Sequence, residues 1–337
     1  MDLWVTFIGT AASVPTASRG TSATLVVRGG SRVLVDCGEG TQRQFLRSGL
    51  GLIDLDAILL THLHGDHYLG LPGLLKTYAL RGRTEPLAIV GPPGLAALLG
   101  ALQAVVGRLP FPLDVGEAQP GRVLTLDGAS WEAFPTRHSV RSLGFALIED
   151  PRPGMFDVAA ARARGVPSGP LFGRLQRGET IRVDDAEVRP EQVLGPPRAG
   201  RSVVITGDTE PCEATIVAAT GAELLVHEAT FLDDERERAR ETRHSTAREA
   251  ADVARSAGVQ LLALTHLSSR FSSREIRKEA AAVFGETVVP RDFDQVEVPF
   301  AERGPPVFHL GGVSRGGPDE VPLAAADPGT VSPEPDL

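Results

Sequence analysis

Cysteine is scarce in this 337-residue chain, which contains only Cys37 and Cys212. The two lie far apart and form no C-x-x-C pair, which argues against a disulfide scaffold or a cysteine-built zinc site. No apolar run reaches the roughly 18–20 residues that cross a bilayer. The first fifteen residues also lack the basic and apolar stretches of a signal peptide. We therefore expect a cytoplasmic protein that does not associate with a membrane.

Positive charge is also in deficit, because the formal net charge is −9, and this argues against general attraction to nucleic acid. The deficit is uneven along the chain. From Arg152 to Arg182, six arginines stand against two acids, a local net charge of +4 that leaves −13 for the remainder. Residues 315–337 carry one arginine against five acids, among many Pro, Gly and Ala residues. We expect the segment 311–337 to form a disordered acidic tail.

Strand-like and helix-like runs alternate along most of the chain, which is typical of an α/β fold. Residues 3–9 read as a strand, and residues 71–82 read as a helix opened by proline and closed by glycine. A later helix is expected to begin with a capping box of Thr246 and Glu249.

The stretch 151–200 breaks this alternation, because it is rich in Pro, Gly and Arg and shows little core-forming pattern. We therefore predict a domain in two halves, at 1–150 and 196–310, with a flexible basic arm inserted at 151–195.

The stretch "LTHLHGDHYLG" at residues 60–70 places four ligand-type side chains in six positions, namely His62, His64, Asp66 and His67. In an extended chain alternate side chains share a face, so the first three could point into one cavity. Gly65 would allow a turn that brings His67 to the same place. A lone histidine is more often a hydrogen-bonded core residue than a ligand, but four such residues together favour a metal site.

Further ligand-type residues stand at the C-terminal edges of predicted strands. His138 follows "WEAFPTR", Asp208 ends "VVITGD" and His266 ends "LLALTH". Such edges are where an α/β sheet builds a site. Seven ligands are too many for one tetrahedral ion, whereas two ions that share the Asp208 carboxylate fit the count. Because imidazole and carboxylate groups suit zinc, we predict two Zn²⁺ per chain, with Mn²⁺ or Fe²⁺ as alternatives.

The pattern H-x-H-x-D-H, followed by distant His, Asp and His, is the signature of the metallo-β-lactamase superfamily, and within it the chain resembles the ribonuclease Z family. The likeness runs from about residue 3 to 302 and includes, in order, "VDCGEGTQ", "LTHLHGDHYLGLPGLL", "RHSVRSLGFALIE", "GVPSGPLFGRLQRG", "VHEATF" and "HSTAREAA". The resemblance implies a four-layer αβ/βα sandwich with a protruding basic arm. It also implies two metal positions that share Asp208, one with His62, His64 and His138 and the other with Asp66, His67 and His266.

The resemblance further implies a zinc-dependent endoribonuclease that removes the 3′ trailer from precursor tRNA by two-metal phosphodiester hydrolysis. The tRNA would keep a 3′-hydroxyl and the trailer a 5′-phosphate. Such enzymes are often homodimers, in which the arm of one subunit grips a tRNA whose end enters the site of the other. We expect arginines of the arm to contact the tRNA backbone; the candidates are Arg152, Arg162, Arg164, Arg174 and Arg177.

Catalytic roles follow for two residues. The resemblance implies that Asp66 accepts the proton of the attacking water. His244 in "RHSTAREAA" is our candidate for supplying a proton to the leaving 3′-oxygen, although a plain exposed residue before a helix is the alternative. His227 is expected to be structural and His309 incidental.

Asp36 and Glu39 in "VDCGEG" could orient the ligating histidines, with turn-forming polarity as the alternative.

Two other functions remain open from the sequence. Another hydrolase of the superfamily, acting on a small phosphodiester, an arylsulfate or a lactone, would share the metal ligands but would have no need of a basic arm. A non-catalytic RNA-binding relative would typically have lost ligands, and all seven are present here.

Overall fold

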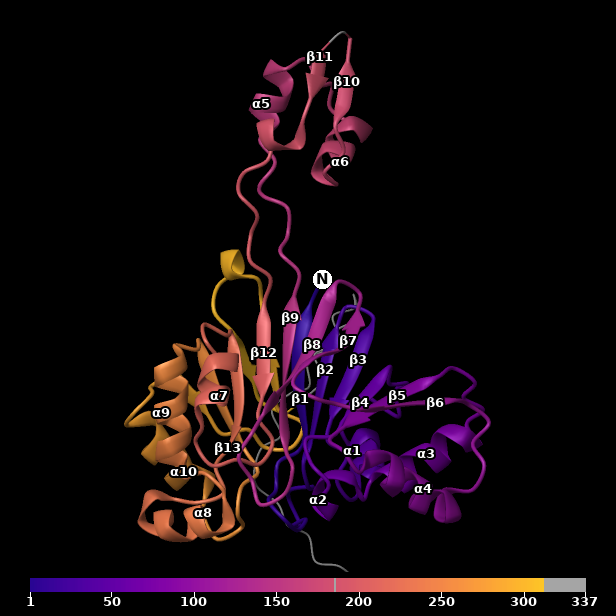
Figure 1. Cartoon of the computed structure of the whole chain (residues 1–337). Helices are drawn as coiled ribbons and strands as arrows, with labels where there is room; N and C mark the ends of the chain where they lie inside the picture. Colours follow the sequence, from indigo (N-terminus) through magenta and orange to yellow (C-terminus); the bar gives the residue numbers. More distant parts are fainter. Residues whose placement is uncertain (185, 312–337) are drawn as a thin grey trace, which may run out of the picture.

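The protein is described here by a computed structural model that covers residues 1–184 and 186–311. Within these ranges most strands belong to two large sheets that pack face to face (Figure 1). The first has eight strands: β1 (Leu3–Gly9), β2 (Ala23–Arg28), β3 (Ser31–Val35), β4 (Ala57–Leu59), β5 (Leu87–Gly91), β6 (Leu113–Glu117), β16 (Gln295–Glu297) and β17 (Val307–His309). The second has seven: β7 (Gly121–Leu126), β8 (Ala129–Pro135), β9 (Leu143–Glu149), β12 (Ser202–Ile205), β13 (Leu224–Glu228), β14 (Leu261–Thr265) and β15 (Thr287–Val288).

The main core lies between the two sheets and follows the two-residue period of the strands. In β1, Leu3, Val5 and Phe7 are fully buried in this core, whereas Ile8 belongs to the cluster beneath the helices of the first sheet. In β13, Leu224 and Leu225 divide in the same way between the two sides of the second sheet. Strands with apolar residues on both faces require cover on both faces, and this explains the layered architecture.

Helices cover the outer face of each sheet and complete four layers, as the family resemblance implied. On the first sheet lie α1 (Thr41–Arg47), α2 (Gly65–Tyr68), α3 (Leu71–Leu80) and α4 (Leu95–Val106). On the second lie α7 (Glu213–Ala218), α8 (Arg236–Thr242), α9 (Ala247–Ala257) and α10 (Ser273–Ala281). The capping box predicted for α9 is confirmed, because the Glu249 N–H donates to Thr246 Oγ1 and the Thr246 N–H donates to the Glu249 carboxylate, both at 3.1 Å. In the described ranges, no helix has the length and apolar character needed to cross a bilayer.

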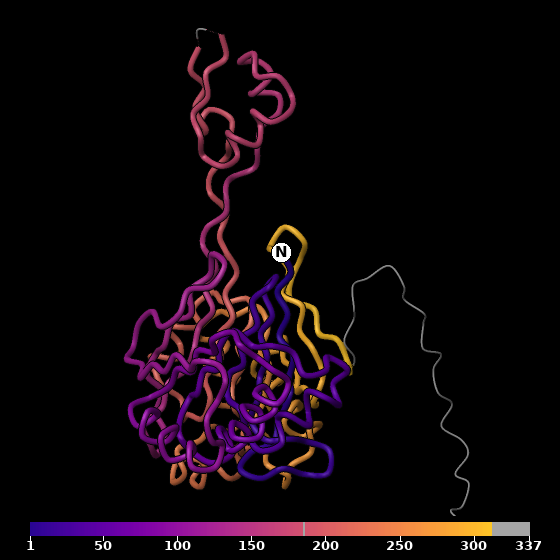
Figure 2. The backbone as a smooth tube through the Cα atoms, turned by 90° about the vertical axis from the view of Figure 1, so that its right-hand side faces the viewer, coloured from indigo at the N-terminus to yellow at the C-terminus, as the bar shows by residue number. Residues whose placement is uncertain are grey.

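The arm leaves the sandwich at the end of β9 and returns at the start of β12 (Figure 1). Its two connecting segments run side by side, as both views show (Figure 2), and pair at Arg152 with Arg198 and at Phe156 with Leu194. Their close approach requires glycine, because a Cβ at Gly154 would lie 1.9 Å from the carbonyl oxygen of Gly195.

The tip of the arm has a small core of its own, contrary to the weak pattern that the sequence suggested. It comprises α5 (Val158–Ala163), α6 (Pro170–Gln176) and the hairpin of β10 (Ile181–Val183) and β11 (Ala186–Val188). The buried residues of this core are Ala161, Val166, Leu175, Ile181, Val188 and Val193. They are spaced irregularly in the sequence, with Pro and Gly between them, so no helical or strand period indicates that they are buried. The acidic tail expected at 311–337 lies, beyond Gly311, outside the described residues.

The base of the arm is fixed to the sandwich by charged and aromatic contacts. Glu302 accepts hydrogen bonds from Arg152 at 2.9 and 3.0 Å and from Arg198 at 2.8 Å. The guanidinium carbons of Arg152 and Arg201 lie 3.4 and 3.9 Å from the ring centroid of Phe300. We call Glu302, Phe300 and the arginines that contact them the arm clamp.

Candidate metal centre and general acid

All seven ligand-type residues named from the sequence meet at one edge of the sandwich. Strands β3 to β6 run parallel in the first sheet and β12 to β15 run parallel in the second, so their carboxyl ends share an edge. The loop after β4 supplies His62, the loop after β12 supplies Asp208, and His266 follows β14 directly. Strand β8 runs in the same direction as β12 and brings His138 to this edge.

The local conformation of the H-x-H-x-D-H stretch differs from the extended chain that we expected. His64 is extended (φ −79°, ψ 150°), but helix α2 begins at Gly65, one residue before Asp66. A helical turn places neighbouring side chains about 100° apart, so Asp66 and His67 leave the face shared by His62 and His64. The stretch therefore serves two groups of ligands rather than one.

The first group gathers His62, His64, His138 and Asp208, whose ligand atoms all lie within 4.8 Å of one another. The Nδ1 of His64 lies 3.0 Å from Nε2 of His62 and 3.2 Å from Nε2 of His138. Three imidazole nitrogens thus converge on one point.

The second group gathers Asp66, His67 and His266, also within 4.8 Å. Asp208 stands beside it as well, because its Oδ2 lies 3.4 Å from Nε2 of His67 and 3.2 Å from Nε2 of His266. The same oxygen lies 3.6 Å from Nε2 of His62. Asp208 therefore occupies the position between the two groups.

Close approach of the two loops depends on a glycine. Gly207 has a φ of +63°, and a Cβ there would lie 2.6 Å from Cβ of Thr61. Only glycine therefore lets the turn that carries Asp208 lie against the loop that carries His62.

Buried polar atoms without hydrogen-bond partners at this edge are consistent with a role as metal ligands. His67 Nε2 and Asp208 Oδ1 are buried and make no hydrogen bond to any described residue. Buried polar atoms without partners are rare in folded proteins, and here they belong to residues whose other ligand atoms converge. Burial lowers the pKa of His62, which favours the neutral form of the ring that a metal ligand requires. The residues present therefore fit divalent metal ions.

A second layer of contacts orients the ligands. The Thr61 hydroxyl lies 3.1 and 3.0 Å from the two carboxylate oxygens of Asp36 and donates its proton to them. The Thr61 Oγ1 atom is therefore free to accept a hydrogen bond from Nδ1–H of His62 at 3.1 Å. Asp36 also accepts from Nδ1–H of His67 at 2.7 Å. Both rings thereby direct Nε2 toward the cluster. Asp36, with a left-handed φ of 61°, thus contacts the ligands as hypothesised. Glu39 is exposed, and among the described residues its contact is a hydrogen bond from the Thr21 hydroxyl to its carbonyl oxygen, so it does not orient the ligands.

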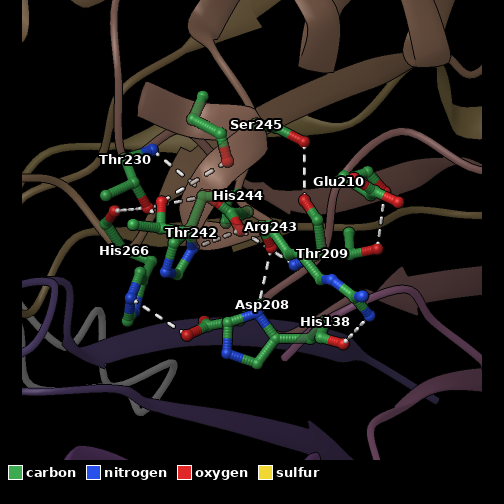
Figure 3. A network of polar contacts seen from close by, with 12 residues as sticks. His138, Asp208, Thr209, Glu210, Thr230, Thr242, Arg243, His244, Ser245 and His266 are labelled. Carbon is green, nitrogen blue, oxygen red and sulfur yellow. Dashed lines mark hydrogen bonds and ion pairs between the residues drawn. The ribbon is translucent and has the colours of Figure 1, made fainter. Parts of the chain in front are cut away.

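Two of the remaining three ligand rings, those of His138 and His266, are oriented by other partners. The Nδ1–H of His138 donates to the carbonyl oxygen of Arg243 at 2.9 Å, as Figure 3 shows. The Nδ1 of His266 lies 3.0 Å from Ser22 Oγ.

His244 lies at the rim of the ligand cluster rather than in open solvent. Its ring stacks on His266 at 5.5 Å and contacts His138 edge-on at 4.9 Å (Figure 3). Its Nδ1–H donates to Glu228 at 2.7 Å. Although burial opposes the charged form, the carboxylate of Glu228 raises the pKa of His244 to about 9. The left-handed Arg243 (φ 57°), which ends α8, turns the chain into this position.

Glu228 is a residue that the sequence analysis missed. It ends β13, is buried, and also accepts from the Thr209 N–H at 2.8 Å and the Thr230 hydroxyl at 2.7 Å. A carboxylate at a strand end in "VHEAT" was the available signal. Its neighbour His227 is buried in β13, where Nδ1–H donates to the carbonyl oxygen of Glu228 at 2.8 Å, and it belongs to neither ligand group. The ring of His309 lies 5.2 Å from that of Trp4 at a tilt of 45°, remote from these groups in the sheet order.

The arginines named for the arm lie in different settings. Arg152 belongs to the arm clamp and does not reach the tip. Arg174 and Arg177 both pair with Glu179, at 2.8 and 3.3 Å. Arg162 bonds to Ser168, and Arg164 bonds to the carbonyl oxygen of Ala160.

Known proteins share this architecture. The model of the metallo-β-lactamase superfamily matches residues 18–186. The crystal structure of human tRNase Z, short form, superposes with a TM-score of 0.65 and 27% identity, over 88% of this chain and all of that one. The four layers and the ligand edge thus define a protein of the metallo-β-lactamase fold.

Proteins similar in sequence identify the family within this superfamily. A protein named Ribonuclease Z from Halorubrum lacusprofundi is 49% identical over 90% of this chain and 99% of its own length. Another of that name, from Myxococcus xanthus, is 48% identical over 89% of this chain and 99% of its own. The chain belongs to the ribonuclease Z family of the metallo-β-lactamase superfamily.

Proposed function

We propose that this chain is the endoribonuclease that removes the 3′ trailer from precursor tRNA. The observation that carries the proposal is the intact ligand edge in a chain that aligns with Ribonuclease Z proteins over nearly their full length. A non-catalytic relative would have no use for seven converging ligands. A small-molecule hydrolase would have no use for the arm.

We assign two metal positions that share Asp208, the first completed by His62, His64 and His138 and the second by Asp66, His67 and His266. The mixture of imidazole and carboxylate ligands favours Zn²⁺, with Mn²⁺ or Fe²⁺ as alternatives. Two such ions, when bound, supply a nucleophile at neutral pH and stabilise negative charge on the phosphate.

Two side chains of the protein then accept and donate the protons of the reaction. Asp66 accepts the proton of the attacking water, and the Ser13 N–H, 3.0 Å from Asp66 Oδ2, holds the carboxylate in place. His244 donates a proton to the leaving 3′-oxygen, and Glu228 orients its ring. Cleavage leaves a 3′-hydroxyl on the tRNA and a 5′-phosphate on the trailer.

The direction of the arm supports a homodimer. Strand β9 runs antiparallel to β8 and β12, so the arm leaves the sandwich at the end opposite the ligand edge (Figure 1). A tRNA gripped by the arm would therefore be far from the ligands of the same copy. We infer that the arm of one copy holds a tRNA whose 3′ end enters the site of a second copy. The two free cysteines fit the reducing cytoplasm that we propose as its location.

Cleavage of a 3′-extended precursor tRNA, with the new 3′ end mapped, tests the proposal. The matched variant replaces residues 154–196 by two glycines, which is feasible because Arg152 and Arg198 pair across the stalk. We expect one cut near the acceptor end by the wild type, and loss of that cut with retained hydrolysis of bis(p-nitrophenyl) phosphate in the variant. A fully metallated wild type that leaves the precursor intact would contradict the proposal.

A further inference from the structure

A basic hollow lies beside α10, separate from both the arm and the ligand edge. It has a volume of about 800 Å³ and lies between α10 and the segment 289–294. We call it the α10 pocket. Four cations line it: Arg274, Arg277, Lys278 and Arg291.

The cations of the α10 pocket lack the carboxylate partners that surface arginines commonly have. Within residues 1–184 and 186–311, Arg274, Lys278 and Arg291 form no ion pair, and Arg277 makes only a 3.4 Å hydrogen bond to the Thr287 carbonyl oxygen. By contrast, Arg174 and Arg177 at the tip of the arm share Glu179. Charge is thus left available at the pocket in a chain whose formal net charge is −9.

Two aspartates also line the α10 pocket, but both are buried and occupied by other donors. Asp292 accepts from Thr10 Oγ1 at 2.7 Å, from the Gly20 N–H at 2.6 Å and from Gln44 Nε2 at 2.5 Å. Asp294 accepts from the backbone N–H groups of Arg291 and Gly311 at 2.8 and 2.6 Å. These carboxylates therefore support the wall of the pocket and do not pair with its cations.

The α10 pocket is tied to the ligand edge through the loop of residues 10–20. Arg19 donates to Ser273 Oγ at 2.9 Å and to the Pro290 carbonyl oxygen at 2.8 Å, on the pocket side. The same loop carries the Ser13 N–H that contacts Asp66. Ser273 comes seven positions after His266 in the chain, which limits the distance between their Cα atoms to about 25 Å. Both α10 and α2 lie in the half of the molecule away from the arm (Figure 1).

We propose that the α10 pocket binds a backbone phosphate of the RNA close to the cleavage site, as a subsite distinct from the arm. Unpaired arginine and lysine side chains around a hollow suit phosphodiester oxygens and would read charge and shape rather than sequence. The inference rests on the proposed function, because it assumes an RNA substrate at the neighbouring ligand edge.

The test is steady-state cleavage by the full chain of two precursor tRNAs, one with a long trailer and one with a single-nucleotide trailer. The variant is Arg274→Glu/Lys278→Glu, and the matched control is Arg122→Glu/Arg255→Glu, which changes the net charge equally at exposed positions elsewhere. We expect the pocket variant to raise KM about tenfold or more. The slope of log(kcat/KM) against log[salt] should become shallower by about one to two, which corresponds to the loss of one or two phosphate contacts. Hydrolysis of bis(p-nitrophenyl) phosphate is expected to stay unchanged.

A rise in KM confined to the long trailer would place the trailer in the α10 pocket, and a rise with both substrates would place the tRNA side there. An unchanged KM, an equal rise in the control, or an equal loss on bis(p-nitrophenyl) phosphate would overturn the inference. A wild type that fails to cut either precursor would instead overturn the proposed function.

Discussion

The ligand edge and the arm are built in opposite ways. Five of the seven ligand-type residues are buried, among them His62 and His67 at 0% and Asp208 at 2% exposure, whereas His64 and Asp66 are partly exposed. The arm is an exposed outgrowth with a core of six buried side chains, joined to the sandwich by two extended segments and the arm clamp.

With the functions that we propose for the two regions, this difference separates chemistry from substrate capture within one chain. Chemistry needs ligand atoms held to a fraction of an ångström, and this precision requires a buried scaffold. Capture of a large polyanion needs reach and charge, which an exposed protrusion provides. Changes at the edge should therefore affect every substrate, whereas changes in the arm should affect tRNA alone.

Asp208→Asn is expected to have the largest effect. It alters the carboxylate that lies beside both ligand groups, so kcat should fall by at least about 10³-fold on both precursor tRNA and bis(p-nitrophenyl) phosphate. Metal content per chain, measured by elemental analysis, should fall as well. Retention of both ions and of activity would contradict our assignment of Asp208.

His244→Ala should reduce cleavage of precursor tRNA by about 10²–10⁴-fold, because the leaving 3′-oxygen loses its proton donor. The loss should be far smaller on bis(p-nitrophenyl) phosphate, whose leaving group needs no proton. Equal losses on both substrates would show that His244 supports the ligand cluster and is not a general acid. Metal content should match the wild type.

Asp36→Asn is expected to weaken metal binding by about 10–100-fold, because it disturbs the contacts that orient His62 through Thr61 and His67 directly. Activity at saturating metal should recover most of the loss. Titration of the metal-free protein with Zn²⁺ measures the effect. A wild-type affinity would mean that Asp36 has no orienting role.

Glu302→Gln should loosen the arm clamp and raise KM for precursor tRNA several-fold, with kcat and the hydrolysis of bis(p-nitrophenyl) phosphate unchanged. Glu187→Gln is the control, because it removes an exposed carboxylate that pairs with Arg189 inside the arm. If both variants behave alike, the orientation of the arm does not depend on the clamp.

Glu149→Gln should have little effect on activity at neutral pH but should change acid stability. Although burial disfavours the carboxylate, hydrogen bonds from Arg201 and Arg28 lower the pKa of Glu149 from 4.5 to about 2. The ionised group therefore stabilises the fold above about pH 5, and this contribution disappears as the pH falls toward 2. The variant should unfold roughly 5 °C or more lower at pH 7, with a weaker dependence of Tm on pH between 5 and 2. Glu132→Gln is the control, because Glu132 belongs to a loose, exposed ion pair, and its Tm should match that of the wild type at each pH.

Regular elements with a clear period were predictable. Strand β1 has the bounds expected, and the start of α9 was marked by its capping box. The edge strand β6 was not predicted, because its residues are mostly exposed and Leu113 and Val115 alone make too short an apolar alternation to indicate a strand. The core of the arm was missed for the related reason that its buried residues follow no period.

The sequence by itself determined the α/β class and the seven ligand-type residues, because local periodicity and ligand chemistry are written in residue types and spacing. The four-layer arrangement and the family followed from the resemblance of its motifs to known proteins. The resemblance implied how the ligands divide into two groups, but the physical cause of the division is tertiary, since α2 begins one residue before Asp66. Tertiary structure alone decided which groups orient the ligands, because Asp36 meets Thr61 and Glu228 meets His244 only when distant strand ends share an edge. The unpaired cations of the α10 pocket are likewise a property of the folded chain, since sequence records the charges but not their partners.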